Sequence, residues 1–344
     1  MNEKKLFLER SEYSAKRIER LKGEFANLKE FQQFPKLSVY ITGSYARLEA
    51  SVNSDIDVFF VNIGKEKDIE NPNTKRIRLF GKVLEITENL QLQPVSNDGQ
   101  YLVLLHTDDI VSKLGSPTDD HENYFTARML LLLESSCIYG EEVYKDLIEI
   151  IVESYYIDFP DHKDNFKTRF LMNDICRYWK TMLLNYENKR RYKLTSSSKS
   201  KKSKKKLAEE ELLKTKQKVK NYKLKYSRMT TCFATIAALG SYPSPVHKEK
   251  VIELVKKTPR QRLESIPKHI PGAKRAVSRV LSGYAKFLEM TALTAEELEE
   301  HLSDEARREK LFKEANAYGD SMFELLKVID KVNPELNLIR NMVI

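Results

Sequence analysis

The stretch that decides the fold spans residues 40–61 and reads Tyr40-Ile-Thr-Gly43-Ser44-Tyr-Ala-Arg47-Leu-Glu-Ala-Ser-Val-Asn-Ser54-Asp55-Ile56-Asp57-Val-Phe-Phe-Val61. Apolar and β-branched residues alternate up to Thr42, which predicts a strand over residues 37–42. The pair Gly43-Ser44 predicts a turn into a short helix. A second strand is expected over residues 56–61. The stretch therefore predicts two strands joined through a turn and a short helix.

Two aspartates stand at the head of the second strand. Side chains i and i+2 of a strand lie on one face, about 6 to 7 Å apart, so Asp55 and Asp57 point together while Ile56 faces the core. Neighbouring carboxylates repel each other, and divalent cations relieve that repulsion. Oxygen ligands suit Mg²⁺, with Mn²⁺ as an alternative, and paired ions can activate a hydroxyl and stabilise a departing phosphate oxygen. A solvated strand edge explains Asp55 but not Asp57, which lies within an apolar strand, so the pair predicts a metal site.

The turn before these aspartates has features that suit a phosphate group. Gly43 lets a phosphate approach the backbone closely, and Ser44 can cap the short helix, whose free amides attract anions. Arg47 lies one turn further on and can add a charge-assisted contact. Gly43, Ser44 and Arg47 are therefore candidate nucleotide-binding residues.

Gly43-Ser44, ten intervening residues and Asp55-Ile56-Asp57 at the head of an apolar strand resemble the signature of the DNA polymerase β-like nucleotidyltransferase superfamily. The resemblance covers about 22 residues. It implies two-metal transfer of a nucleotide from an NTP to an acceptor hydroxyl, with release of pyrophosphate. It also implies that Asp55 and Asp57 are metal ligands, that Gly43 and Ser44 bind the triphosphate, and that a later strand carries a third carboxylate.

The third carboxylate has no clear position in the sequence. No acid lies within residues 101–106, the extended stretch where one is expected; Asp98 precedes it, and Asp108 and Asp109 follow it. Asp98 is also the natural first residue of an Asp-Gly hairpin turn between residues 92–95 and 101–106. Both a catalytic role and a turn role therefore remain open for Asp98.

The predicted fold class is α+β, a small mixed-sheet nucleotidyltransferase domain followed by a helical domain. A chain of 344 residues exceeds one typical hydrophobic core. Helical periodicity covers much of residues 2–32 and 74–90, and the pattern is helical almost throughout from residue 123. We expect a first domain over residues 1–120 and a helical domain over residues 121–344.

The net charge of +9 is typical of proteins that bind nucleic acid, but the surplus of basic over acidic residues lies in one segment. Residues 189–228 contain 17 Lys or Arg against three Glu, so the remaining chain sums to −5. This basic insertion includes a low-complexity Ser/Lys stretch that we expect to stay unfolded in isolation. It is either a solvated, mobile tether or an RNA-binding arm with salt-dependent affinity, in which Tyr192, Tyr222 and Tyr226 can stack on bases.

The helix expected over residues 170–186 carries Asn173, Arg177 and Lys180 on one face. That face is either ordinary solvated surface or, by resemblance to bacterial stand-alone nucleotidyltransferases, a nucleotide-binding face that closes over the triphosphate. A second arginine, Arg128, lies in a helix that is apolar nearly all round. A buried guanidinium needs a partner, so we expect Arg128 to pair with an acid such as Glu134, or else to face the substrate cleft.

The compartment is predicted from what the sequence lacks. The N-terminus has no apolar signal-peptide core, and the longest apolar run, Met129–Leu133, is far too short to span a bilayer. A cytoplasmic protein without a membrane partner is expected, with Cys137, Cys176 and Cys232 as reduced core thiols. The histidines are scattered, which disfavours zinc chemistry, and no feature specifies an oligomeric state.

These observations predict an Mg²⁺-dependent nucleotidyltransferase that uses an NTP, such as ATP. The leading acceptor is RNA, for example a tRNA end, and the basic insertion is its only support. The alternatives are synthesis of an oligonucleotide messenger in anti-phage defence and transfer of AMP or UMP to a protein hydroxyl. A non-enzymatic alternative is an inactive module that binds RNA.

Overall fold

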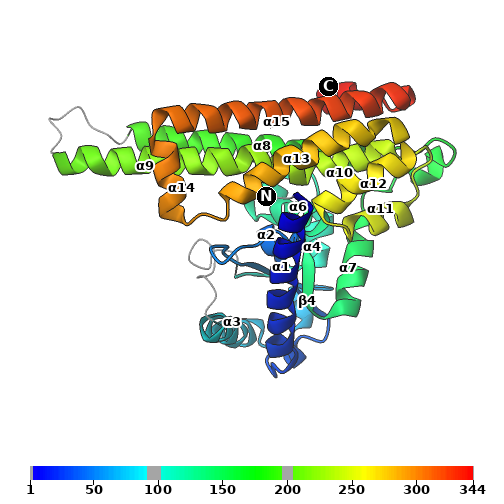
Figure 1. Cartoon of the computed structure of the whole chain (residues 1–344). Helices are drawn as coiled ribbons and strands as arrows, with labels where there is room; N and C mark the ends of the chain where they lie inside the picture. The colour runs from blue at the N-terminus through cyan, green and yellow to red at the C-terminus, as the bar shows by residue number, and fades with distance from the viewer. Residues whose placement is uncertain (1–2, 91–101, 196–203, 344) are drawn as a thin grey trace. The chain divides into compact units, whose positions relative to one another are not determined.

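The computed structural model describes residues 3–90, 102–195 and 204–343 (Figure 1). The chain forms two compact units. Unit 1 comprises residues 1–168 and 244–262, and unit 2 comprises residues 169–243 and 263–344. The last of the three boundaries, between Arg262 and Leu263, falls within helix α12 (Pro259–His269).

Unit 1 is built on a four-stranded mixed sheet with the order β3-β2-β1-β4. Strand β1 pairs antiparallel with β2 and with β4, and β2 pairs parallel with β3. The strands predicted from alternation are confirmed, and the α+β class is confirmed with them. The bounds are β1 Leu37–Thr42, β2 Asp57–Asn62, β3 Leu104–His106 and β4 Ser136–Tyr139.

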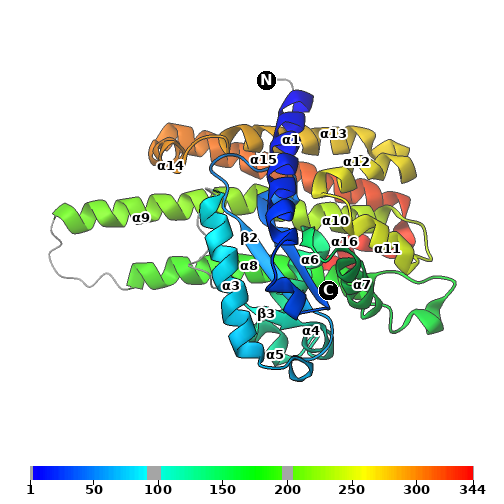
Figure 2. The same ribbon diagram turned by 90° about the horizontal axis from the view of Figure 1, so that it is seen from below.

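Helices cover both faces of this sheet. Alternate residues of β1 and β2 (Val39, Ile41, Val58 and Phe60) form one core with Phe25 of α1 and Leu79 of α3. Figure 2 shows α1 and α3 in front of β2 and β3. On the opposite face, the ring of Tyr40 contacts the ring of Tyr144 in α7 at 6.1 Å, and its hydroxyl donates to the carbonyl of Ala127 in α6 at 3.5 Å. The sheet is therefore a buried platform that fixes the strand ends.

Strand β4 differs from the continuous helical pattern that the sequence predicts beyond residue 123. It lies between α6 and α7, pairs with β1 through Tyr40–Cys137 and Ile41–Ser136, and completes the sheet. The first compact unit extends to residue 168 and also includes residues 244–262, whereas the sequence led us to expect a boundary at residue 120. Four residues are too few for the strand period to stand out between two helical patterns.

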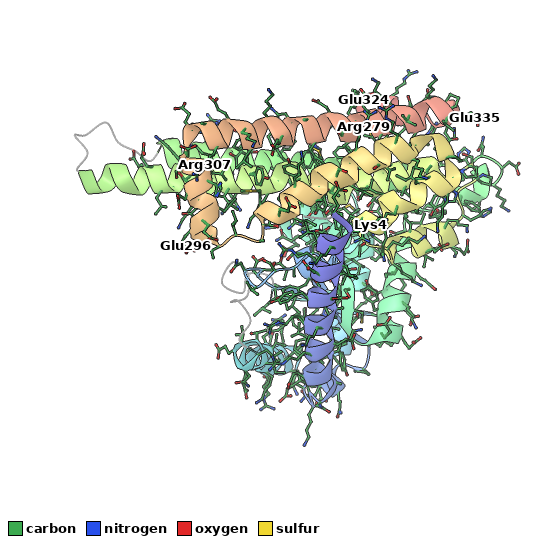
Figure 3. The ribbon with its side chains drawn as sticks, in the orientation of Figure 1. Lys4, Arg279, Glu296, Arg307, Glu324 and Glu335 are labelled. Atoms are coloured by element: carbon green, nitrogen blue, oxygen red, sulfur yellow. The ribbon has the colours of Figure 1, made fainter. Side chains whose placement is uncertain are left out.

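Unit 2 is helical. Its core includes a cluster of aromatic rings: Tyr226 stacks on Phe287 at 4.9 Å and on Tyr318 at 4.7 Å, and Tyr222 lies 5.2 Å from Tyr226. The charged side chains of α14 and α15, such as Glu296, Arg307 and Glu324, lie on the outside (Figure 3). The alternation of acidic and basic residues thus marks the exposed faces of these helices.

The cluster corrects one expectation for the basic insertion. Tyr222 and Tyr226 are each 1% exposed, so they are core residues and do not offer rings to bases. The insertion is also largely helical: α8 continues to Thr195, α9 begins at Lys204, and a π-helical segment follows at Leu224–Arg228. The Ser/Lys stretch at residues 196–203 lies outside the described residues, as does the predicted strand at residues 92–95. The side chain of Tyr192 is not described either.

The remaining elements complete the two units. No helix among the described residues is long and apolar enough to cross a membrane. Cys137, Cys176 and Cys232 are free and buried, as expected. The helices of unit 1 are α1 Glu3–Ala26, α2 Gly43–Ala46, α3 Pro72–Asn89, α4 Thr107–Ser112, α5 Pro117–His121, α6 Tyr124–Leu133, α7 Glu141–Glu153 and α11 Lys248–Val255. The helices of unit 2 are α8 Arg169–Thr195, α9 Lys204–Lys223, α10 Met229–Ser241, α13 Lys274–Met290, α14 Ala295–Ser303, α15 Glu305–Val332 and α16 Leu338–Val343.

Candidate active site

The register of β1 and β2 brings the two halves of the sequence motif together. Thr42, the last residue of β1, pairs with Asp57, the first residue of β2. Because the strands are antiparallel, the turn that follows Thr42 lies at the end of the sheet where Asp57 enters it. Asp55 is exposed and Asp57 is partly buried, so both carboxylates remain accessible to solvent.

Gly43 lies directly against Asp57. A Cβ atom built on Gly43 would stand 3.3 Å from Oδ2 of Asp57, and Gly43 has a φ of +73°. An L-residue at this position would be strained by its backbone and would crowd the carboxylate. The structure thus explains why the motif has glycine here: the backbone passes immediately beside the acid.

Helix α2 begins at Gly43, so Ser44 lies inside its first turn and is not its cap. Thr42 holds the cap position without a side-chain cap hydrogen bond. Ser44 is partly exposed. The capping role expected for Ser44 is therefore not observed, while its place beside Gly43 keeps it at the same end of the sheet as Asp57.

A Schellman motif ends α2. The amide of Glu49 donates to the carbonyl of Ser44 at 2.8 Å, and the amide of Leu48 donates to the carbonyl of Tyr45 at 3.0 Å. Leu48 has a φ of 59°, in the left-handed region where glycine is usual. The chain leaves the Gly43-Ser44 turn through this closed helix end and continues toward Asp55.

Arg47 lies in a buried ion-pair network instead of facing open solvent. Its Nε donates to Glu49 Oε2 at 2.7 Å, and its Nη1 donates to Glu134 Oε2 at 2.5 Å. The side chains are 7% exposed for Arg47, 4% for Glu49 and 0% for Glu134. Two carboxylates therefore already engage the guanidinium, which favours a structural role for Arg47 over the phosphate contact that the sequence predicts.

Helix α1 contributes residues near the site that the sequence did not indicate. Burial raises the pKa of Tyr45 to about 12; Tyr13 and Asp55 add to this shift, and Arg17 opposes it. The guanidinium of Arg17 lies 5.6 Å from the ring centroid of Tyr13. The charges of Arg17 and Asp55 thus act on the pKa of Tyr45 in opposite directions. No local pattern marks Arg17, because its position depends on the packing of α1 against α2.

The opposite end of the sheet holds two of the candidate third carboxylates. Asp108 and Asp109 lie in α4, after β3, and β3 runs parallel to β2. Lys65, which follows β2, forms an ion pair with Asp108 at 3.6 Å. Six strand residues span about 16 Å, so these acids lie far from Asp57. Asp98, which precedes β3, lies outside the described residues.

Arg128 is fully buried and paired, but not with the partner named from the sequence. Its Nη1 and Nη2 donate to Asp119 Oδ1 and Oδ2 at 2.9 and 2.7 Å. Its Nε donates to the Tyr155 hydroxyl at 2.8 Å. The expected partner, Glu134, binds Arg47 instead. The structural interpretation of Arg128 therefore holds, with Asp119 as the acid.

The candidates on α8 belong to unit 2. Asn173 and Lys180 are exposed, and Arg177 is partly buried. Arg177 Nη1 lies 3.3 Å from Asp174 Oδ1, an acid that is 4% exposed. The nucleotide-binding role of these three residues stays a prediction.

Unit 1 is thus a small mixed sheet with a Gly-Ser turn at the end of β1 and an Asp-x-Asp pair at the start of β2. Comparison with known families shows that residues 25–98 match the model described as the nucleotidyltransferase domain. This segment is a nucleotidyltransferase domain, consistent with the DNA polymerase β-like superfamily, and it supports a transferase of phosphorus-containing groups. Such a domain implies an NTP substrate. No curated protein matches the chain.

Proposed function

We propose that the protein transfers an NMP from an NTP to an acceptor hydroxyl, with pyrophosphate as the leaving group. The observation that supports the proposal is the register of Thr42 with Asp57, which brings Gly43 directly beside the Asp57 carboxylate. In this proposal Gly43 and Ser44 bind the triphosphate, and Asp55 and Asp57 face the reacting phosphorus. Gly43 has no side chain to fill the space that a phosphate oxygen would need.

The donor set at this edge suits Mg²⁺, with Mn²⁺ as an alternative. Asp55 and Asp57 supply hard carboxylate oxygens that solvent can reach. Among the described residues no group of three or more potential ligands could hold a metal, which agrees with a pair that needs further oxygens from the triphosphate or from Asp98. When bound, Mg²⁺ would neutralise charge on the phosphates and lower the pKa of the acceptor hydroxyl.

Asp98 is our candidate for the third carboxylate. Support comes from the sheet: β3 runs parallel to β2, so the chain enters β3 from the end at which Asp57 lies, whereas Asp108 and Asp109 lie at the far end. A general base at Asp98 would accept the proton of the acceptor hydroxyl. We expect Asp98→Asn to abolish turnover and to leave Mg²⁺-dependent NTP binding within about threefold. Normal turnover by this variant would return Asp98 to a turn role.

Asn173, Arg177 and Lys180 remain our candidates for contacts to the sugar and phosphates of the nucleotide. Support comes from the positive charges of Arg177 and Lys180 and from the exposure of Asn173 and Lys180. We expect Lys180→Ala to raise the KM for the NTP several-fold with a smaller change in kcat. Arg190→Ala is the matched control, because Arg190 lies on the same helix and is paired with Glu187 at 2.9 Å. Equal kinetics for the two variants would assign this face to solvent.

RNA is the acceptor that we favour. Lys216, Lys220 and Lys223 are exposed on α9 at spacings of four and three residues, which places them on one face of that helix. Such a row can neutralise phosphates without reading sequence. The expected signature is an affinity for RNA that falls steeply with salt and becomes weaker and less salt-dependent in a Lys216/Lys220/Lys223→Gln variant.

The experiment that tests the function is incubation with each labelled NTP and Mg²⁺, with no acceptor, with total RNA or with lysate protein. Label in RNA supports the favoured acceptor. A small labelled product without acceptor supports messenger synthesis, and labelled protein supports AMP or UMP transfer. No labelled product with any acceptor, together with salt-sensitive RNA binding, would support an inactive RNA-binding module.

A further inference from the structure

The segment that connects the Gly43-Ser44 turn to Asp55 and Asp57 takes part in a buried charge network. The proposed transfer chemistry does not use this network. Residues 47–54 join the end of α2 to Asp55. Within this connection, Arg47 bonds to Glu49, and the same guanidinium reaches Glu134 at the end of α6. The network therefore ties the middle of the motif to an element nearly 90 residues further along the chain.

Helix α1 fixes the same connection from another side. The amide of Ala50 donates to Ser14 Oγ at 3.0 Å, and Ser14 Oγ donates to the carbonyl of Arg10 at 2.8 Å. Burial lowers the pKa of Arg10, and the carboxylate of Glu49 opposes that shift. The positive charges of two arginines thus match the negative charges of two glutamates at this connection. All four residues are at most 7% exposed: Arg10, Arg47, Glu49 and Glu134.

Buried ion pairs contribute little net stability compared with well-packed apolar residues, because removing charges from water offsets most of their attraction. What they do provide is a fixed orientation of the groups that they join. A planar guanidinium held between two carboxylates fixes both distance and angle, and a catalytic constellation needs a supporting shell of this kind. An apolar cluster would fill the same volume without fixing the path of the chain.

We propose that Arg47, held between Glu49 and Glu134, is a positioning residue that keeps the Gly43-Ser44 turn in register with Asp55 and Asp57. This inference rests on the proposed function and assigns a role to residues that do not touch the substrate. Small displacements of reacting groups lower rates strongly, by up to about a hundredfold for 1 Å, so loosening this connection slows the transfer step more than it weakens NTP binding.

The test compares Arg47→Lys with Arg128→Lys in the full chain. Both variants keep the buried positive charge and lose the planar guanidinium with its several N–H donors. The hydrogen bonds of Arg128 to Asp119 join α6 to α5 and lie outside the connection at residues 47–54. We expect similar losses of Tm. Only Arg47→Lys should speed amide hydrogen exchange in residues 43–57, raise the Mg²⁺ concentration for half-maximal rate, and lower kcat about tenfold or more with a smaller change in KM.

Wild-type kcat in a folded Arg47→Lys variant, or equal effects of the two substitutions on exchange in residues 43–57, would overturn the proposal. If Arg47→Lys does not fold, Glu49→Gln replaces it, because that change leaves the Arg47–Glu134 pair in place, and the same readouts decide. If the wild-type protein transfers no nucleotide, the proposed function fails. The exchange comparison then still decides whether the network holds the turn.

Discussion

Gly43 and Asp57 are packed so that a single added carbon would fill the space between them. A Cβ atom on Gly43 would lie 3.3 Å from Oδ2 of Asp57, and the φ of +73° at Gly43 disfavours any residue with a side chain. The relationship follows from the pairing of Thr42 with Asp57, which places the first residue of the turn beside the first residue of the strand. It makes the geometry of the site sensitive to one methyl group.

Substitution Gly43→Ala should therefore impair both folding and turnover. Left-handed backbone at an alanine costs about 1 to 2 kcal/mol, and the methyl group displaces the Asp57 carboxylate, so we expect a larger loss in kcat than stability alone explains. The control is Gly81→Ala. A Cβ atom on Gly81, in helix α3, would meet no neighbouring side chain within 4 Å, and alanine there should stabilise the helix by about 0.5 to 1 kcal/mol. Urea denaturation and initial rates separate the two effects; a fully active Gly43→Ala enzyme would contradict this geometry.

Leu48 offers a second test of the same segment. Its φ of 59° lies in the left-handed region, where β-branched residues are most strongly disfavoured. We expect Leu48→Val to be less stable than Leu48→Gly by about 1 kcal/mol, although valine retains more apolar surface. The order of the two midpoints in urea checks this, and the reverse order would show that packing, not backbone conformation, governs the position.

Much of unit 1 could be predicted from sequence because its signals are local. The alternation in residues 37–42 and the turn at Gly43 indicated the strand, the short helix and the acid pair. Strand β4 could not be predicted, since its four residues follow an apolar helix and pair with the distant strand β1. The ion-pair partners of the buried arginines could not be predicted from the sequence either. Arg128 binds Asp119 and Arg47 binds Glu134, choices that depend on which helix ends the sheet brings together.

Tyr222 and Tyr226 show the same limit in unit 2. Their lysine-rich surroundings predict exposure, but both rings are buried among aromatic residues from distant helices. The basic side chains between them turn outward because a helix separates its faces. The lysine-rich sequence therefore predicted that the basic side chains are exposed, but it did not predict that Tyr222 and Tyr226 are buried.

Breaking the buried pair of Arg128 and Asp119 is expected to destabilise unit 1 strongly, although the intact pair itself contributes little net stability. Both side chains are 0% exposed. Asp119→Ala would leave a buried guanidinium without its carboxylate, and breaking such pairs costs about 3 to 5 kcal/mol. Urea unfolding measures the loss. Asp120→Ala is the control, since Asp120 is exposed on the same helix; equal midpoints for the two variants would refute this expectation.

Stability should depend on pH through His106, which ends β3 and is 5% exposed. Burial lowers the pKa of His106, an effect partly opposed by Glu66 and Asp109. Since the folded pKa lies below the unfolded value of about 6.5, the unfolded chain binds the proton more readily. The stabilising contribution is therefore present above about pH 6.5 and lost as the pH falls through the folded pKa.

A His106→Gln variant should show a flatter dependence of its urea midpoint on pH between about 5 and 7. Replacing the exposed His121 by Gln is the matched control and should leave the slope unchanged. An identical slope in wild type and His106→Gln would exclude His106 as its source.

The most direct test of the central claim is pyrophosphate release from an NTP in the presence of acceptor, measured with and without Mg²⁺. We compare the wild-type protein with an Asp55→Asn/Asp57→Asn variant and with an Asp108→Asn/Asp109→Asn control, whose acids lie at the other end of the sheet. The account predicts Mg²⁺-dependent release by the wild type and the control, and none above background by the first variant. Release at the wild-type rate by the Asp55/Asp57 variant would contradict it.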